Sequence, residues 1–103
     1  MDSKLESAFH DEMLGVYERA KVECRYTATR FIQMVTDHGG LAAAKMLLAS
    51  PRLSEGLTRL WQERRLDISM EATVLREPWC QLFTAEELAV ARKRLNELGY
   101  VGK

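Results

Sequence analysis

The sequence predicts an all-α fold, a compact bundle of about five to six short-to-medium helices in a single domain that spans residues 1–103. Apolar residues recur at intervals of three and four in several windows, which is the spacing of one helix face. Glycine, proline and short polar residues separate these windows. No window of convincing length shows the alternation of a strand, and 103 residues suit one core.

The first helix is predicted from Leu5 to Cys24, where apolar residues form a continuous stripe. Asp2 or Ser3 is the expected cap, because a short side-chain oxygen can accept from an unpaired amide of the first turn. The run His10-Asp11-Glu12 suggests a metal site at first sight. Since His10 and Glu12 are two residues apart and point to different faces, we expect a solvated helix face there instead.

Two further helices are predicted on either side of a glycine pair. The second begins with Thr27 as its cap and runs to Asp37, and His38-Gly39-Gly40 ends it. The third spans Leu41–Ala49, whose alanines allow neighbouring backbones to approach closely. Pro51 follows, and the residue before a proline is disfavoured in helical geometry. The glycine pair is therefore a hinge between two helices.

The second half of the chain contains several helix starts. Ser54 is the expected cap of a fourth helix, and Ser69 that of a helix of one or two turns. The segment Pro78–Phe83 is expected to form a helical turn. Thr84–Glu87 has the pattern of a capping box, in which two side chains satisfy each other's backbone donors. A final helix follows, and Gly99 is its expected end.

Composition excludes several classes of function. The net charge is zero, which removes the overall attraction that marks a free-standing nucleic-acid binder. No apolar run approaches the length of a bilayer span and no secretory signal is evident, so we expect a cytoplasmic protein. Cys24 and Cys80 lie far apart without neighbouring metal ligands, and we expect them to be apolar fillers. We predict no catalytic residue, metal or cofactor.

Charge is nevertheless distributed unevenly along the chain. Residues 1–23 carry three bases and six acids, whereas residues 24–66 carry seven bases and three acids. Within the basic part, the turn after the third helix and the fourth helix form a hairpin with four candidate nucleic-acid contacts, Arg52, Arg59, Arg64 and Arg65. The alternative is intramolecular: Arg59 is spaced for a helix pair with Glu63, and Arg65 for a tether to Asp67.

Both tryptophans, one phenylalanine and one tyrosine lie in the second half of the chain. Trp61, Trp79, Phe83 and Tyr100 either fill the core or form a patch for a partner. In a chain this short most large apolar side chains are needed inside, which favours the core for the tryptophans. Trp61 and Tyr100 are the candidates for partner contact, and Tyr100 lies nearest the end of the sequence.

Residues 17–98 resemble a small bacterial all-helical family of uncharacterised function, whose members stand alone or are appended to larger proteins. The resemblance rests on Tyr17–Ala20, Ala28–Phe31, His38–Lys45, Leu60-Trp61, Arg65–Glu71, Leu82-Phe83 and Glu86–Leu88. Some relatives accompany nuclease or restriction-type proteins, so the resemblance implies work related to nucleic acid. It implies no catalytic or binding residue.

The function predicted from these patterns is that of a non-enzymatic helical interaction or accessory module, which binds another protein or itself. Its support is the supply of apolar helix faces together with the lack of an assembled polar site. A DNA-binding accessory protein that uses the basic hairpin is the alternative. Neither hypothesis involves a membrane or a small-molecule substrate.

Overall fold

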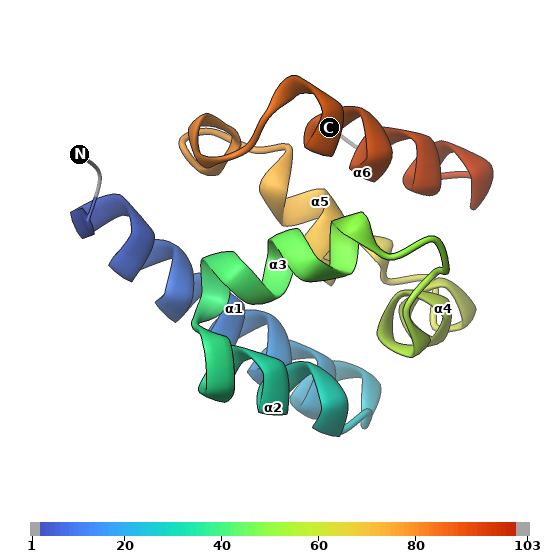
Figure 1. Ribbon diagram of the computed structural model, residues 1–103. Helices are drawn as coiled ribbons and strands as arrows, with labels where there is room; N and C mark the ends of the chain where they lie inside the picture. The colour runs from blue at the N-terminus through green and yellow to red at the C-terminus, as the bar shows by residue number, and fades with distance from the viewer. Residues whose placement is uncertain (1–2, 101–103) are drawn as a thin grey trace.

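The computed structural model describes residues 3–100, which form six α-helices and two short 3₁₀ helices (Figure 1). The helices are α1 (Ser3–Cys24), α2 (Thr29–His38), α3 (Gly40–Ala49), α4 (Glu55–Gln62), α5 (Met70–Val74) and α6 (Ala85–Glu97), with η1 (Leu66–Ile68) and η2 (Trp79–Leu82) between them. The predicted all-α bundle of five to six helices is confirmed. Asp2 and the side chain of Ser3, the expected first cap, lie outside the described residues.

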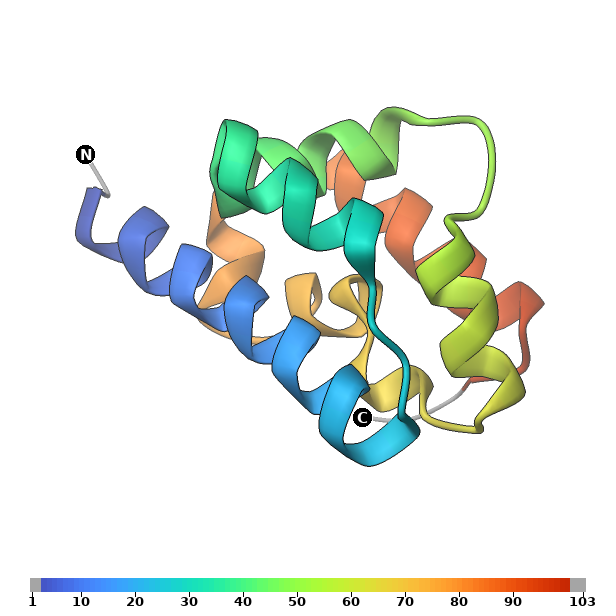
Figure 2. The same cartoon turned by 90° about the horizontal axis from the view of Figure 1, so that it is seen from below.

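The long helix α1 supports the rest of the bundle. α2 and α3 fold back on each other and pack on α1, while the short helix α5 lies inside the bundle and is covered by α6 (Figure 1). α4 stands apart at one end, where it packs mainly against η1 (Figure 2). Within residues 3–100, no helix is long and apolar enough to cross a membrane.

One hydrophobic core joins these helices. α1 contributes residues spaced by three and four, as its apolar stripe predicts, and α3 contributes alanines that let it approach α1 closely. The members that are less than 1% exposed are Phe9, Met13, Val35, Ala43, Ala44, Val74 and Ala91. α5 is buried along its whole length, so it depends on this packing more than on its own five residues.

Three of the predicted helix starts are capped as expected. The hydroxyl of Ser54 accepts a hydrogen bond from Leu57 N at 3.0 Å, and that of Ser69 accepts one from Ala72 N at 3.1 Å. The capping box at the start of α6 is complete in both directions. The predicted end of α6 is also correct, because Gly99 has a φ of 84° directly after the last turn.

The predicted cap of α2 is wrong. The helix begins at Thr29 with Ala28 in the cap position, and no side chain caps it. Ala28 is buried, with 6% exposure, and the cap position of α2 therefore falls on Ala28, one residue after the predicted cap Thr27. Thr27 remains exposed and contributes only its carbonyl, which accepts from Thr29 N at 2.9 Å.

The hinge between α2 and α3 is held by His10, a residue that the sequence pattern places on a solvated face. Gly39 has a φ of 89°, a conformation that favours glycine. Gly40 N donates to Nδ1 of His10 at 2.9 Å, so the half-buried imidazole satisfies an amide of the first turn of α3. A Cβ atom at Gly40 would lie 2.7 Å from the Cα atom of His10, which explains why the chain needs glycine there.

We expect Gly40→Ala to lower the free energy of unfolding by about 1–3 kcal/mol, because α3 must move away from α1 to accept the methyl group. Urea unfolding of both proteins measures this. Gly15→Ala is the matched control: its new Cβ would meet only the flexible guanidinium of Arg19, at 3.3 Å. Helix propensity favours that change by about 1 kcal/mol. Equal stability of Gly40→Ala and the wild type would contradict the close approach.

Candidate functional site

Two of the four predicted nucleic-acid contacts are engaged within the molecule. Arg59 Nε lies 3.1 Å from Glu63 Oε2, the helix pair that the spacing allows. Arg65 Nε lies 3.1 Å from Asp67 Oδ1, and its Nη1 lies 2.7 Å from a carboxylate oxygen of Glu23 in α1. The hydrogen bond from Arg65 lowers the pKa of Asp67 despite its partial burial. The intramolecular alternative is therefore confirmed for Arg59 and Arg65.

The other two predicted contacts, Arg52 and Arg64, are exposed and make no ion pair within residues 3–100. They line different hollows of the surface. Arg52 follows α3, whereas Arg64 has a φ of 60° at the end of α4. Arg52 and Arg64, the two arginines of this hairpin that make no ion pair among the described residues, therefore lie at separate places on the surface.

The structure brings Trp61 and Tyr100 together in one groove. The groove has a volume of about 520 Å³ and lies between the ends of α4 and α6. Trp61 is 46% exposed, and Tyr100 is half-buried. The residues that line it are Trp61, Gln62, Arg64, Leu66, Leu98, Gly99 and Tyr100, which we call the Trp61–Tyr100 groove.

Both walls of this groove are built by the same type of helix ending. At the end of α4, Arg65 N donates to Leu60 O at 2.8 Å, and at the end of α6, Tyr100 N donates to Leu95 O at 2.9 Å. In each case the residue before the donor has a positive φ, as in a Schellman motif. These turns fold both chain segments back toward their helices and fix the backbone beside the groove.

The other aromatic candidates belong mainly to the core. Phe83 is 8% exposed, and its ring centroid lies 5.5 Å from that of Phe9 in an edge-on arrangement. Trp79 is half-buried, with its centroid 5.7 Å from that of Phe9. The core interpretation holds for these two and fails for Trp61. α4 ends directly after Trp61, and on that side nothing among residues 3–100 covers the indole completely.

Sequence reasoning missed a buried charged pair, Glu71 and Arg94, which are 2% and 7% exposed. Arg94 Nη1 lies 3.7 Å from Glu71 Oε2, beyond hydrogen-bonding distance. The guanidinium instead donates to carbonyl oxygens at the end of α3, namely to Leu47 at 3.0 Å, to Leu48 at 3.4 Å and to Ser50. Glu71 Oε2 has no hydrogen-bond partner among the described residues.

Burial raises the pKa of Glu71, and this effect exceeds the lowering by a backbone hydrogen bond and by the charge of Arg94. The sequence contained a signal that both side chains are buried, because each occupies a position of an apolar helix stripe. Arg94 lies three residues after Ala91 and four before Leu98, and Glu71 lies between Ile68 and Leu75 at helical spacing. Both therefore fall on apolar stripes, where a charged residue has to find a partner inside.

Neither cysteine lies in an environment that favours the thiolate form. Cys24 is buried, Cys80 is half-buried, and both are free. Burial raises the pKa of Cys24, and a hydrogen bond to the Glu77 carboxylate raises that of Cys80. Raised pKa values disfavour the thiolate that a nucleophile requires. Across residues 3–100, His, Cys, Asp and Glu form no group of three that could hold a metal ion.

Comparisons of the chain with protein-family models, with curated proteins and with solved structures find no match. The family resemblance of residues 17–98 stays a prediction. The Trp61–Tyr100 groove and the buried Glu71 are the features of the structure that bear most directly on function.

We expect the pH dependence of stability to change in Glu71→Gln. Burial raises the folded pKa of Glu71 above its ordinary value of 4.5. The protonated side chain therefore contributes its full stability below pH 4.5, and this contribution is lost as the pH rises through the folded pKa. Between pH 4 and pH 7 the wild type should therefore lose stability relative to the variant, by about 1.4 kcal/mol for every pH unit that separates the folded pKa from the unfolded one.

Urea unfolding of both proteins across this pH range measures the difference. Glu86→Gln, which removes an exposed carboxylate in the first turn of α6, should show a much smaller change relative to the wild type. A stability difference between Glu71→Gln and the wild type that does not vary with pH would contradict the assignment.

Proposed function

We propose that this chain is a non-enzymatic helical interaction module that binds a partner protein, or a second copy of itself, through the Trp61–Tyr100 groove. One observation carries the proposal: two large aromatic residues from segments far apart in the sequence line the same open groove. An indole that is 46% exposed retains much apolar surface in contact with water. Covering that surface with a partner would release this water and favour binding.

The chemistry of the groove resembles that of interface centres. Tryptophan, tyrosine and arginine are enriched among the residues that contribute most to protein binding, and the groove contains one of each. Leu66 and Leu98 form an apolar floor beneath them. Arg64 at the rim makes no ion pair within the described residues. A segment with an apolar side chain for the floor and a carboxylate for Arg64 would fit this arrangement.

Backbone hydrogen bonds shape both walls of the groove. The two helix endings fix the backbone on both walls, and Leu66 is 6% exposed within the core. A preformed site loses little conformational freedom on binding, so more of the contact energy appears as affinity.

We expect Trp61→Ala to weaken partner binding by at least about 2 kcal/mol, about thirtyfold in affinity, because a central aromatic anchor is lost. The measurement is quantitative affinity capture from the native cell with wild type and variant compared side by side. Val22→Ser is the matched control, since Val22 is 73% exposed on α1, outside the groove. A protein that the wild type and Val22→Ser retain, and Trp61→Ala does not, is the expected result.

Light scattering over a range of concentrations tests the second copy as the occupant. Self-association that Trp61→Ala abolishes would support the groove as a homotypic interface. A monomer at all concentrations, together with identical captured proteins for Trp61→Ala and the wild type, would overturn the proposal.

A DNA-binding accessory role is the second candidate. The observation that favours it is the exposure of Arg52 and Arg64, which have no carboxylate partner among residues 3–100. Each such group can contact a phosphate without first breaking an ion pair. The overall charge of zero and the engagement of Arg59 and Arg65 with carboxylates weigh against a continuous phosphate-binding surface.

If the chain binds DNA, the double variant Arg52→Gln and Arg64→Gln should bind it more weakly. The slope of log affinity against log salt concentration should become shallower by up to about two units, one for each lost phosphate contact. Fluorescence anisotropy with labelled duplex and single-stranded DNA measures this at several salt concentrations. Arg92→Gln with Lys93→Gln, a pair of exposed bases on α6, controls for total charge. No binding of the wild type at low salt would remove this candidate.

A further inference from the structure

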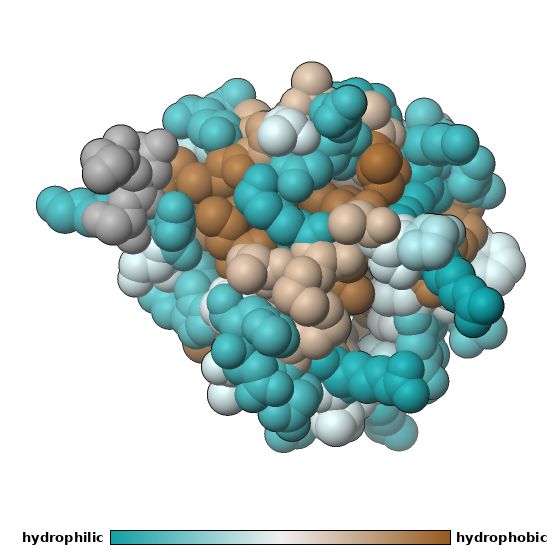
Figure 3. Space-filling view, viewed as in Figure 1, coloured by the Kyte–Doolittle hydropathy of each residue, from teal (hydrophilic) through white to brown (hydrophobic). Residues whose placement is uncertain are grey.

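A second hollow, which we call the α2–α4 cavity, lies between the beginning of α2, the loop after α3 and α4. It has a volume of about 420 Å³ and is more enclosed than the groove. In Figure 3 the surface is hollowed below and to the right of its centre, where these elements meet. Its walls are mainly apolar and include Val16, Phe31, Met34, Leu47, Leu57 and Leu60. Pockets of this size and lining bind small molecules in many proteins.

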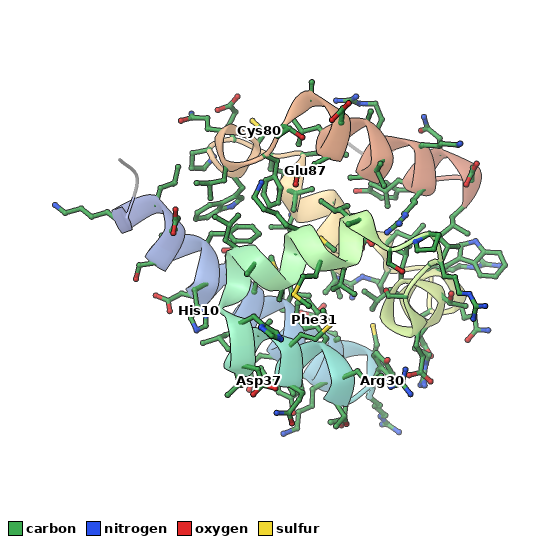
Figure 4. All side chains as sticks on the ribbon, in the orientation of Figure 1. His10, Arg30, Phe31, Asp37, Cys80 and Glu87 are labelled. Atoms are coloured by element: carbon green, nitrogen blue, oxygen red, sulfur yellow. The ribbon has the colours of Figure 1, made fainter. Side chains whose placement is uncertain are left out.

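The charged residues at the entrance of the cavity are of both signs. Arg30 and Arg52 line it, and so does Glu55, the first residue of α4; all three are exposed. None of them makes an ion pair among residues 3–100. Arg30 extends from the beginning of α2 on the side of α4, and Phe31 follows it on the same helix (Figure 4). An entrance of mixed charge does not select an anion or a cation.

The polar group that the cavity offers to a ligand is the hydroxyl of Tyr26. Its oxygen would lie 3.9 Å from a Cβ atom on Gly56, so the ring reaches from the loop after α1 to the first turn of α4. Tyr26 is half-buried, and its hydroxyl makes no hydrogen bond within residues 3–100. Ser54, at the same distance from that Cβ position, already accepts from Leu57 N. The Tyr26 hydroxyl is therefore free to donate to a ligand.

The surroundings of this hydroxyl favour an uncharged ligand group. Burial raises the pKa of Tyr26, the charge of Glu55 raises it further, and that of Arg59 lowers it. The phenol is consequently protonated at neutral pH and acts as a donor. A carboxylate beside it would be repelled by Glu55, and an ammonium by Arg59, whose guanidinium carbon lies 5.2 Å from the ring centroid. Either ion would also lose hydration next to apolar walls.

We propose that the α2–α4 cavity is a binding site for a small uncharged molecule with an aromatic or alkyl body and one hydrogen-bond acceptor. The body fills the apolar chamber, and the acceptor receives the hydrogen bond of the Tyr26 hydroxyl. This site is separate from the Trp61–Tyr100 groove, and its ligand is distinct from a protein partner there. Burial of the ligand's apolar surface supplies most of the affinity, and the hydroxyl fixes the orientation.

The test compares four probes with one aromatic ring: acetophenone, ethylbenzene, benzoate and benzylammonium. We expect the two uncharged probes to bind with dissociation constants on the order of 1 mM at pH 7, and the two ions at least tenfold more weakly. Titration followed by NMR should shift the methyl signals of Met34, Leu57 and Leu60 and leave those of Leu66 and Leu98 unchanged. No binding of acetophenone, or tighter binding of either ion, would overturn the proposal.

A pair of variants tests the hydrogen bond. Tyr26→Phe removes only the hydroxyl, so it should weaken the binding of acetophenone about fivefold and leave that of ethylbenzene, which has no acceptor, unchanged. Tyr17→Phe is the matched control, because Tyr17 also lines the cavity and is half-buried; it should change neither affinity. An unchanged affinity of Tyr26→Phe for acetophenone, or a loss in Tyr17→Phe instead, would overturn the assignment of Tyr26.

Gly56→Leu tests the location of the binding site. Gly56 lines the cavity, and a Cβ atom there would have no neighbour nearer than 3.8 Å, the distance to the ring of Tyr26. Leucine also favours the helix more than glycine does, so α4 should be retained, which circular dichroism checks. The new side chain should occupy part of the chamber and weaken the binding of both uncharged probes at least tenfold. Unchanged affinity in the folded variant would place the probes elsewhere and overturn the proposal.

Discussion

The arrangement of the bundle depends on the contacts of one side chain, Arg94. From α6 its guanidinium reaches the last carbonyls of α3 and lies beside Glu71 of α5, so one residue joins three helices that are far apart in sequence. Carbonyls at the end of a helix lack intrahelical partners and need donors. The planar guanidinium offers five donors and keeps its charge, which makes arginine suited to this position.

Beyond this junction the chain leaves α3, and α4 packs mainly against η1 (Figure 2). A hollow lined by residues of α2 and α4 remains on that side of the bundle. The buried pair itself adds little net stability, since the desolvation of two charges offsets much of their attraction. Its effect is to fix the geometry around the carboxylate.

The sequence predicted the helices better than the sites because helix limits depend on local chemistry. Ser54, Ser69 and Thr84 cap through hydroxyls a few residues from the amides they satisfy, so their patterns are visible in the sequence. The cap of α2 failed because the burial of Ala28, a tertiary effect, decided the boundary. Glu71 lacks a donor for the same kind of reason: only the folded arrangement shows that Arg94 is directed to other acceptors.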